Sequence, residues 1–148
     1  MDYQLKFIDY GSDEYYQAAQ LRYRLFYQEH NIPFESIFEP AEKQDLHLAI
    51  TTSLENIVLA YGRLGKNNSD EFQIYQMVVM PEHQGHGLGM RILHVLIEVA
   101  VERGASLLTL NARTTKVRFY QKAGFETIGE VFASYTTGVP HIKMQKNL

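Results

Sequence analysis

The sequence predicts an α+β domain of three layers, in which helices flank a mixed, mostly antiparallel central sheet. Between residues 47 and 80, β-rich runs follow one another across short turns, a pattern typical of antiparallel strands joined by hairpins. A long amphipathic segment then separates two apolar strand-like runs, and such a strand-helix-strand crossover implies that the two strands pair in parallel.

The composition favours one soluble domain spanning residues 1–148. The chain is 45% hydrophobic and 21% charged, as is usual for globular proteins. It has no cysteine, which excludes disulfides, thiolate metal sites and an acyl-cysteine intermediate, so we expect direct transfer chemistry and no metal. The net charge of −3 and the lack of basic clusters argue against nucleic acid as a partner, and no apolar run reaches membrane-spanning length. We therefore expect a cytoplasmic protein with neither nucleic-acid nor membrane partners; a homodimer is left open.

The N-terminal part begins with an alternating run, Tyr3 to Tyr10, that predicts a first strand. Ser12 is the expected N-cap of a helix that reaches about His30, because apolar residues recur there at helical spacing. The segment from Phe34 to Asp45 has no clean period and predicts a short helix or loop. Further strands are expected at His47–Thr52 and Ile57–Leu64, from near Phe72, and at Ser106–Asn111, Phe125–Ala133 and His141–Lys146, with a short helix at Thr115–Ala123.

The stretch from Ile74 to Gly104 organises the chain. An apolar strand ends at Pro81, a glycine-rich turn follows, and apolar residues then recur at helical spacing until Gly104. The first N–H groups of a helix have no internal partner, and glycine lets an anion approach them closely. The turn therefore predicts a pyrophosphate site at the start of this helix.

The spacing within the turn narrows the class of ligand. Met90-Arg91 follows Gly89 where a Walker loop needs Gly-Lys-Ser/Thr, and the sixth position of a Rossmann fingerprint is not glycine. The pattern Q/R-x-x-G-x-G/A does fit, on Gln84, Gly87 and Gly89, and resembles the coenzyme A pyrophosphate loop of the GNAT superfamily of N-acyltransferases. The segment Val117–Phe125 resembles a second signature of that family. The alternative is a glycine-rich turn that only leads into a packed helix.

The order of elements resembles the GNAT fold over the whole chain, which implies a splay between strands four and five. Parts of both ends of the chain are similar to the ElaA-like branch of this family. They are the N-terminal segment LRYRLFYQEHNIPF with Asp45 and His47, and the C-terminal pattern GEVF…GVPHIKM. Thr136-Thr137 stand where that branch usually carries acidic residues. The resemblance implies an acetyl-CoA-dependent N-acetyltransferase that acts on a primary amine of a small molecule or peptide through a ternary complex.

The resemblance also implies roles for particular residues. Tyr120 is the expected general acid for the leaving thiolate, although it could instead be a core tyrosine. The backbone N–H of Val79 is the expected oxyanion donor. The residues expected to contact acetyl-CoA are Met77, Val78, Val79, Gln84, Gly85, His86, Gly87, Leu88, Gly89, Met90, Asn111, Arg113 and Tyr120. Arg113 occupies a position where many family members have Asn.

The general base and the acceptor are less defined. Leu108 stands where several family members carry a catalytic Glu, so Glu29, His47 and His141 remain alternative bases. We expect the acceptor between the segment Glu29–Asp45 and the loop Ser134–His141. Its apolar walls would be Phe34, Phe38 and Tyr135, and its acidic side Glu29, Glu35, Glu39 and Glu42, which favours a cationic amine.

Two other classes of function stay open. A non-catalytic acyl-CoA-binding module would bind the same coenzyme without turnover. A nucleotide-binding domain is disfavoured by the missing lysine and the missing sixth glycine.

Overall fold

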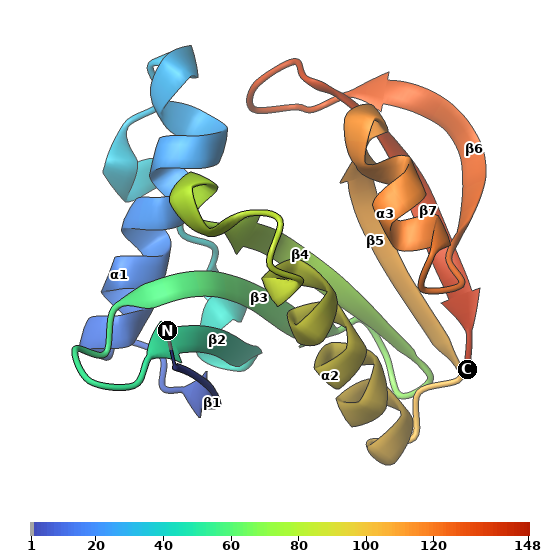
Figure 1. Ribbon diagram of the computed structural model, residues 1–148. Helices are drawn as coiled ribbons and strands as arrows, with labels where there is room; N and C mark the ends of the chain where they lie inside the picture. Colours follow the sequence, from blue (N-terminus) through green and yellow to red (C-terminus); the bar gives the residue numbers. More distant parts are fainter. Residues whose placement is uncertain (1) are drawn as a thin grey trace.

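All the strands belong to one seven-stranded sheet in the computed structural model, which describes residues 2–148. The sheet order is β1-β2-β3-β4-β5-β7-β6, and only β4 and β5 pair in parallel. The strands are β1 (Tyr3–Ile8), β2 (Leu46–Thr52), β3 (Val58–Lys66), β4 (Glu71–Val79), β5 (Leu107–Arg113), β6 (Glu126–Ala133) and β7 (Pro140–Asn147). The predicted mixed, mostly antiparallel sheet is confirmed (Figure 1).

Helices cover both faces of the sheet, as the three-layer prediction requires. Residues of α1 (Asp13–Arg22) pack in one buried cluster, and residues of α2 (Leu88–Glu102) and α3 (Val117–Gln121) belong to or pack against the other. The remaining turns are helical but short: η1 (Tyr23–Tyr27), η2 (Gln28–His30), η3 (Phe34–Ile37), η4 (Pro40–Lys43), η5 (Pro81–His83) and η6 (Thr114–Lys116).

The first helix begins as the sequence predicts and then changes its winding. The Ser12 hydroxyl accepts a hydrogen bond from the Tyr15 N–H at 3.2 Å, so Ser12 is the N-cap. The helical path continues to His30, but α-helical winding ends at Arg22 and η1 is a π-helical turn. Such wider turns are frequent at functional sites, and this one places Leu25, Phe26 and Tyr27 along a cleft.

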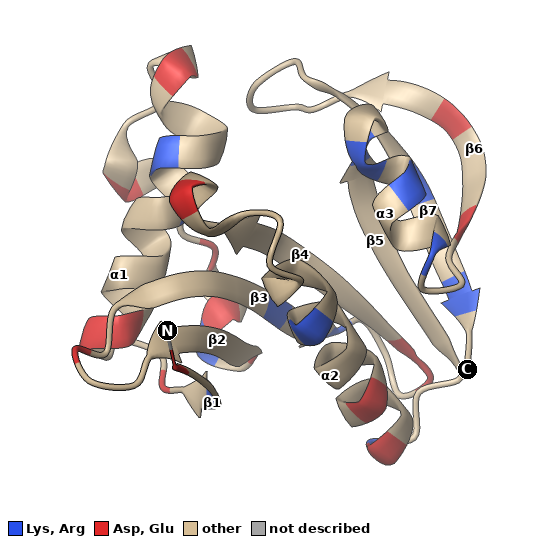
Figure 2. Cartoon of the chain, in the orientation of Figure 1, with Lys and Arg blue, Asp and Glu red and all other residues tan. Residues whose placement is uncertain are grey.

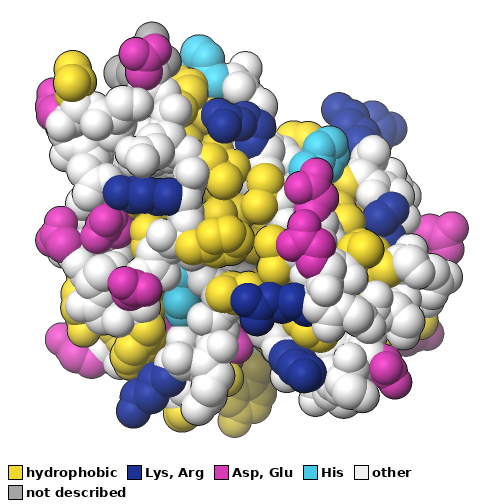
Figure 3. Space-filling model, turned by 90° about the horizontal axis from the view of Figure 1, so that it is seen from below, with side chains coloured by type: hydrophobic (Ala, Val, Ile, Leu, Met, Phe, Trp, Pro, Cys, Tyr) yellow, Lys and Arg dark blue, Asp and Glu magenta, His cyan; other side chains and the backbone are white. Residues whose placement is uncertain are grey.

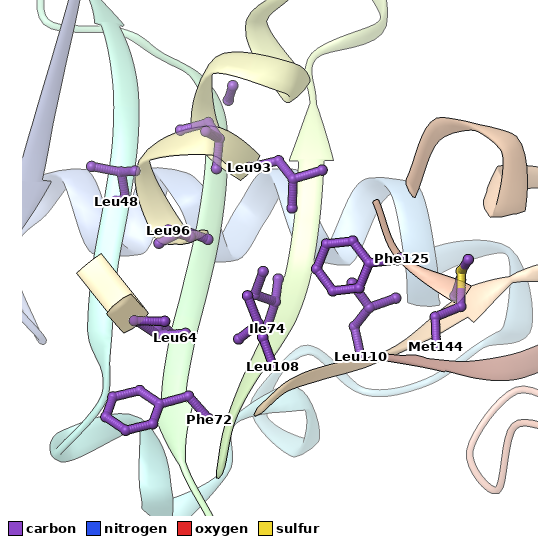
Figure 4. Packing of buried hydrophobic residues seen from close by; sticks show 14 of the residues in the cluster. Leu48, Leu64, Phe72, Ile74, Leu93, Leu96, Leu108, Leu110, Phe125 and Met144 are labelled. Atoms are coloured by element: carbon purple, nitrogen blue, oxygen red, sulfur yellow. The ribbon is translucent and has the colours of Figure 1, made fainter. Parts of the chain in front are cut away.

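The main core lies between α2 and the sheet. Leu93 and Leu96 of α2 point toward Leu48 of β2 and Ile74 of β4, and all four side chains are at most 3% exposed (Figure 4). Each such side chain contributes roughly 1.5–3 kcal/mol through its burial. This packing fixes where α2 begins, and therefore where its N-terminus meets the end of β4.

Strands β4 and β5 pair along only part of their length. Their register runs from Glu71 opposite Leu107 to Gln73 opposite Thr109, and no further pair joins them. Beyond Gln73, β4 keeps β3 as its neighbour while β5 keeps β7, so one edge of β4 is left open (Figure 1). The predicted splay between strands four and five is confirmed.

A bulge interrupts β4 beside this opening. Gln76 has φ +58°, and the register with β3 shifts between Tyr61 and Arg63. Bulges of this kind re-aim side chains next to active sites. Ile74, before the bulge, faces the α2 core, whereas Val78, two positions after Gln76, faces the α1 cluster.

Charged side chains of both signs are spread over the surface. On the face seen in Figure 3, Lys, Arg, Asp and Glu side chains surround a central group of apolar ones. Lys and Arg lie along α3 and β7, whereas Asp and Glu predominate on the N-terminal helical turns (Figure 2). Within residues 2–148, no helix is both long and apolar enough to cross a membrane.

Candidate active site

A cleft of about 830 Å³ opens where β4 and β5 separate. This volume is in the range of small-molecule and cofactor sites. Five structural parts supply most of its lining: the open edge of β4, the loop and first turn of α2, the end of β5 with α3, the turn η1, and the loop before β7.

The glycine-rich loop forms one end of the cleft. Gly85 and Gly87 have φ +84° and +77°, a left-handed conformation that side chains with a Cβ rarely adopt. Gly87 is the N-cap of α2, no side chain caps this end, and the first helical bond runs from the Arg91 N–H to the Gly87 carbonyl. The N–H groups that precede Arg91, in the glycine-rich loop and the first turn of α2, therefore have no helical partner and are free to bind an anion. All predicted loop residues except His86 line the cleft.

The open edge of β4 carries a backbone donor at its end. The Met80 N–H donates to the Leu59 carbonyl of β3 at 2.7 Å. Because successive peptide groups of a strand point to opposite edges, the N–H of Val79 faces the cleft. The Gln84 amide donates to the Val79 carbonyl at 3.2 Å, which ties the loop to this strand end.

Tyr120 of α3 lines the cleft and packs edge-on against Phe119 and Phe125, with ring centroids 5.0 and 6.0 Å away. Burial raises the pKa of its phenol to about 12. The hydroxyl is therefore protonated at neutral pH and can donate a proton or a hydrogen bond. Tyr120 therefore belongs both to the aromatic packing of the core and to the lining of the cleft.

The two histidines considered as bases differ in their hydrogen bonds. His47 is 2% exposed; its Nε2 donates to the Glu42 carbonyl at 2.7 Å and its Nδ1 accepts from the Tyr61 hydroxyl at 2.6 Å. Both nitrogens are thus occupied, and burial lowers the pKa of His47. His141 lines the cleft, and its Nδ1 lies 2.8 Å from the Val139 carbonyl. Since a carbonyl can only accept, Nδ1 carries the proton and Nε2 is left with a free lone pair.

Glu29 does not line the cleft. Its side chain is 72% exposed and lies 3.3 Å from the His30 ring nitrogen. The predicted acidic side of the acceptor cleft is wrong in most of its members, because only Glu39 of the four glutamates lines the cleft. Glu42 is fully buried and its charge is already compensated by arginines. Of the three predicted apolar wall residues, Tyr135 lines the cleft, whereas Phe34 and Phe38 do not.

Charged side chains from α1, β2, β3 and the segment around η4 meet in a buried group that the sequence did not predict as a group. We call it the buried ionic cluster; its members are Arg22, Glu42, Asp45, His47 and Arg63. Glu42 lies 2.9 Å from both guanidinium groups and accepts a 2.6 Å hydrogen bond from the Tyr15 hydroxyl. Burial by itself would raise the pKa of Glu42, but the hydrogen bonds and charge of Arg22 outweigh burial and bring this pKa to about 2.

The cluster touches the cleft through the β4 bulge. The Arg22 Nε donates to the Gln76 side-chain oxygen at 3.2 Å, and the Gln76 amide donates to the Tyr27 hydroxyl at 3.1 Å. Gln76 and Tyr27 both line the cleft. The only sequence signal for this bulge is that the apolar run Met77 to Met80 lacks the alternation of a regular strand.

The chain is similar to known acetyltransferases in sequence and in fold. Residues 13–148 match a family model described as an acetyltransferase (GNAT) domain. The uncharacterized N-acetyltransferase YjcF of Bacillus subtilis is 27% identical over 130 residues, covering 88% of this chain and 90% of the relative. Two solved structures share the fold. Escherichia coli ElaA has a TM-score of 0.80, 22% identity and coverage of 99% of both chains. A GNAT family acetyltransferase from Elizabethkingia anophelis with acetyl-CoA bound has a TM-score of 0.74 and 16% identity, covering 99% of this chain and 98% of the other.

Proposed function

Because the chain belongs to the GNAT acetyltransferase family and is therefore an acyltransferase, we propose that it transfers an acetyl group from acetyl-CoA directly to a primary amine. The acceptor is a small molecule or a peptide. The observation that carries the proposal is the meeting of the open β4 edge, the uncapped α2 N-terminus and Tyr120 in one cleft.

The coenzyme would occupy the cleft along β4. The N–H groups from Gly85 to Met90 suit its pyrophosphate, because they are unpaired and lie at the positive end of a helix dipole. The peptide groups of Met77 to Val79 suit its pantetheine arm, which can add to the open edge as a further strand does. Asn111 lines the facing side of the cleft. The acetyl-CoA bound to the Elizabethkingia neighbour supports this choice of donor.

The cleft residues can supply the proton transfers at the acceptor ammonium and at the thiolate. His141 Nε2 accepts a proton from the ammonium of the acceptor, and the neutral amine nitrogen then bonds to the thioester carbonyl carbon. The nitrogen of the adduct now carries a surplus proton, which it releases to solvent as the amide forms. The Val79 N–H stabilises the oxyanion of the resulting tetrahedral adduct. When the carbon–sulfur bond breaks, the Tyr120 hydroxyl donates its proton to the thiolate, and proton exchange with solvent restores both side chains.

The choice of His141 as base follows from its lone pair. Of the three alternatives, Glu29 lies outside the cleft and His47 has both ring nitrogens hydrogen-bonded. Only His141 combines a position in the cleft with a free Nε2.

A non-catalytic acyl-CoA-binding module would share the coenzyme site, so the two functions separate on turnover. We expect the protein to release free coenzyme A thiol from acetyl-CoA when a panel of primary amines is supplied, and to form the matching N-acetyl products. Tight acetyl-CoA binding with no amine-dependent thiol release across a broad panel would favour the binding module.

The coenzyme site is tested by Gly87→Val with Gly11→Val as its control. Both glycines have left-handed backbones, at φ +77° and +81°, and a Cβ at either would meet no atom within 4 Å, so both variants carry similar backbone strain. Only Gly87 lines the cleft. We expect calorimetry to detect no acetyl-CoA binding for Gly87→Val and wild-type affinity for Gly11→Val; wild-type affinity in both variants would remove the loop from the site.

A further inference from the structure

Arg113 reaches across the cleft from the end of β5. Its guanidinium carbon lies 4.9 Å from the centre of the Phe26 ring, which belongs to η1 on the opposite wall. Both side chains line the cleft. The guanidinium is therefore held over an aromatic face by a cation–π contact, at a place that a bound molecule can reach.

Arg113 has no carboxylate partner. Within residues 2–148, no acidic side chain forms an ion pair with it. Among the other arginines, Arg22 and Arg63 are buried and paired, Arg24 pairs with Glu82, and the rest are exposed to solvent. Arg113 alone is half-buried, unpaired and directed into the cleft, which leaves its planar donors available for an anion.

The guanidinium lies on the α1 side of the sheet, away from the loop at the α2 N-terminus. Leu108, Leu110 and Ala112 of β5 face the α2 core. Because side chains alternate along a strand, Arg113 faces the other layer, where it meets Phe26. The Phe119 side of the cleft, by contrast, packs against Gly89 of the pyrophosphate loop.

Arg113 is also a neighbour of the proposed base. Arg113 and His141 are register partners on β5 and β7, and such cross-strand pairs have their side chains side by side on one face. A molecule whose amine approaches His141 would thus have Arg113 next to its reacting end. The other charged residues lining the cleft are Lys116 and Glu39, and Glu39 already lies 3.5 Å from the Arg63 guanidinium.

We propose that Arg113 binds a carboxylate of the acceptor, so that the acetylated amine belongs to a molecule that carries both groups, as an amino acid does. The inference rests on the proposed function and specifies its acceptor class; it moves Arg113 from the residues expected to contact acetyl-CoA to those that bind the acceptor. A planar guanidinium can bind a carboxylate through two parallel hydrogen bonds.

The test compares matched amines that differ by a carboxylate: L-phenylalanine with phenethylamine, L-leucine with isoamylamine and L-lysine with cadaverine, with phosphoethanolamine as a phosphate-bearing arm. Each is assayed for thiol release with wild type, Arg113→Met, Arg113→Lys and the exposed control Arg118→Met. Comparing each variant with wild type on the same amine cancels differences in amine pKa. Tm and acetyl-CoA affinity are measured for every variant.

We expect Arg113→Met to lower kcat/KM for the carboxylated amines by roughly 10- to 100-fold, the range for a hydrogen bond to a charged group. Its kcat/KM for the decarboxylated partners, and its acetyl-CoA affinity, should stay within about twofold of wild type. Arg113→Lys should lose less, and Arg118→Met nothing. Equal losses for both members of each pair overturn the inference, as do a preference for phosphoethanolamine and a defect confined to acetyl-CoA affinity.

A binding measurement separates failure of this inference from failure of the proposed function. If no amine is acetylated, N-acetyl-L-phenylalanine and N-acetylphenethylamine are titrated into protein saturated with coenzyme A. Tighter binding of the carboxylated compound that disappears in Arg113→Met supports the carboxylate site without turnover. Equal binding of the two compounds overturns it. If Arg113→Met does not fold, Arg113→Lys decides both assays.

Discussion

The buried ionic cluster and the C-terminal wall of the cleft both contain arginine and histidine, but these side chains have different ion-pair and hydrogen-bond partners in the two places. In the cluster, Arg22 and Arg63 share the Glu42 carboxylate and both nitrogens of His47 are hydrogen-bonded. On the wall formed by β5, β7 and α3, Arg113 has no ionic partner among residues 2–148, and His141 has one ring nitrogen without a hydrogen bond to this part of the chain. The residue types are the same, so the difference lies in whether each group already has a partner within the protein.

This contrast separates groups that hold the fold from groups that can act on a ligand. A charge buried with its partners stabilises one arrangement of the chain, and removal of one partner leaves the other uncompensated. A half-buried charge or a lone pair that is directed into a cleft can still bind a ligand. The contrast therefore predicts that substitutions in the cluster change stability, whereas substitutions on the wall change binding and turnover.

The largest expected effect on stability is that of Glu42→Gln. The substitution keeps the shape of the side chain but leaves Arg22 and Arg63 without their shared counter-charge, which should lower the free energy of unfolding by about 3–5 kcal/mol. Urea denaturation measures it. The matched control is Glu39→Gln, because Glu39 is 55% exposed and lies 3.5 Å from Arg63; we expect less than about 1 kcal/mol there. Equal losses in the two variants would contradict the distinction between them.

Acid titration gives the same prediction a second signature. Since the folded pKa of Glu42 is about 2, below its ordinary 4.5, its contribution to stability is complete above pH 4.5 and is lost as pH falls toward 2. Wild type should therefore lose stability over this interval more steeply than Glu42→Gln. Parallel acid curves for the two proteins would show that the carboxylate is not held ionised by the cluster.

A smaller free-energy change, expressed in turnover, is expected for Tyr120→Phe. The ring keeps its contacts with Phe119 and Phe125 while the proton donor is lost, so kcat should fall by about 100-fold with little change in Tm or acetyl-CoA affinity. Tyr16→Phe is the control, since Tyr16 is 49% exposed and does not line the cleft. A wild-type kcat for Tyr120→Phe, under conditions where chemistry limits the rate, would remove the phenol from the mechanism.

Much of the cleft could be predicted because its signals are local in the sequence. The strand, the glycine turn and the amphipathic helix follow one another within Ile74–Gly104, and the structure has them there. The resemblance to the GNAT family is confirmed. The splay between strands four and five, which we expected from that resemblance alone, is confirmed as well. Tyr120 lines the cleft as its motif implied, and His141 lines it as the expected position of the loop Ser134–His141 implied.

What could not be predicted depends on residues that are distant in sequence. In the sequence Glu42 looks like one of several surface glutamates. It becomes a buried ion-pair partner because the fold brings Arg22 from a helix and Arg63 from a strand to it. The π-turn at η1 and the bulge at Gln76 are changes of winding and register that hydrophobic periodicity does not encode. The cation–π contact of Arg113 with Phe26 likewise requires the two walls to be placed opposite each other.

The most direct test of the contrast is a crossed measurement on its two histidines, using His141→Gln and His47→Gln. For each variant, kcat is measured across pH with a working acceptor, and the free energy of unfolding is measured by urea denaturation. We predict that His141→Gln loses about 100-fold or more in kcat at neutral pH, recovers part of it as rising pH deprotonates the amine, and keeps its stability within about 0.5 kcal/mol. His47→Gln should lose about 1–3 kcal/mol of stability while its folded fraction turns over at nearly the wild-type rate. A wild-type kcat in His141→Gln would contradict the role of His141 as the base. Equal losses of turnover in His141→Gln and in the folded fraction of His47→Gln would contradict the division between the cluster and the wall.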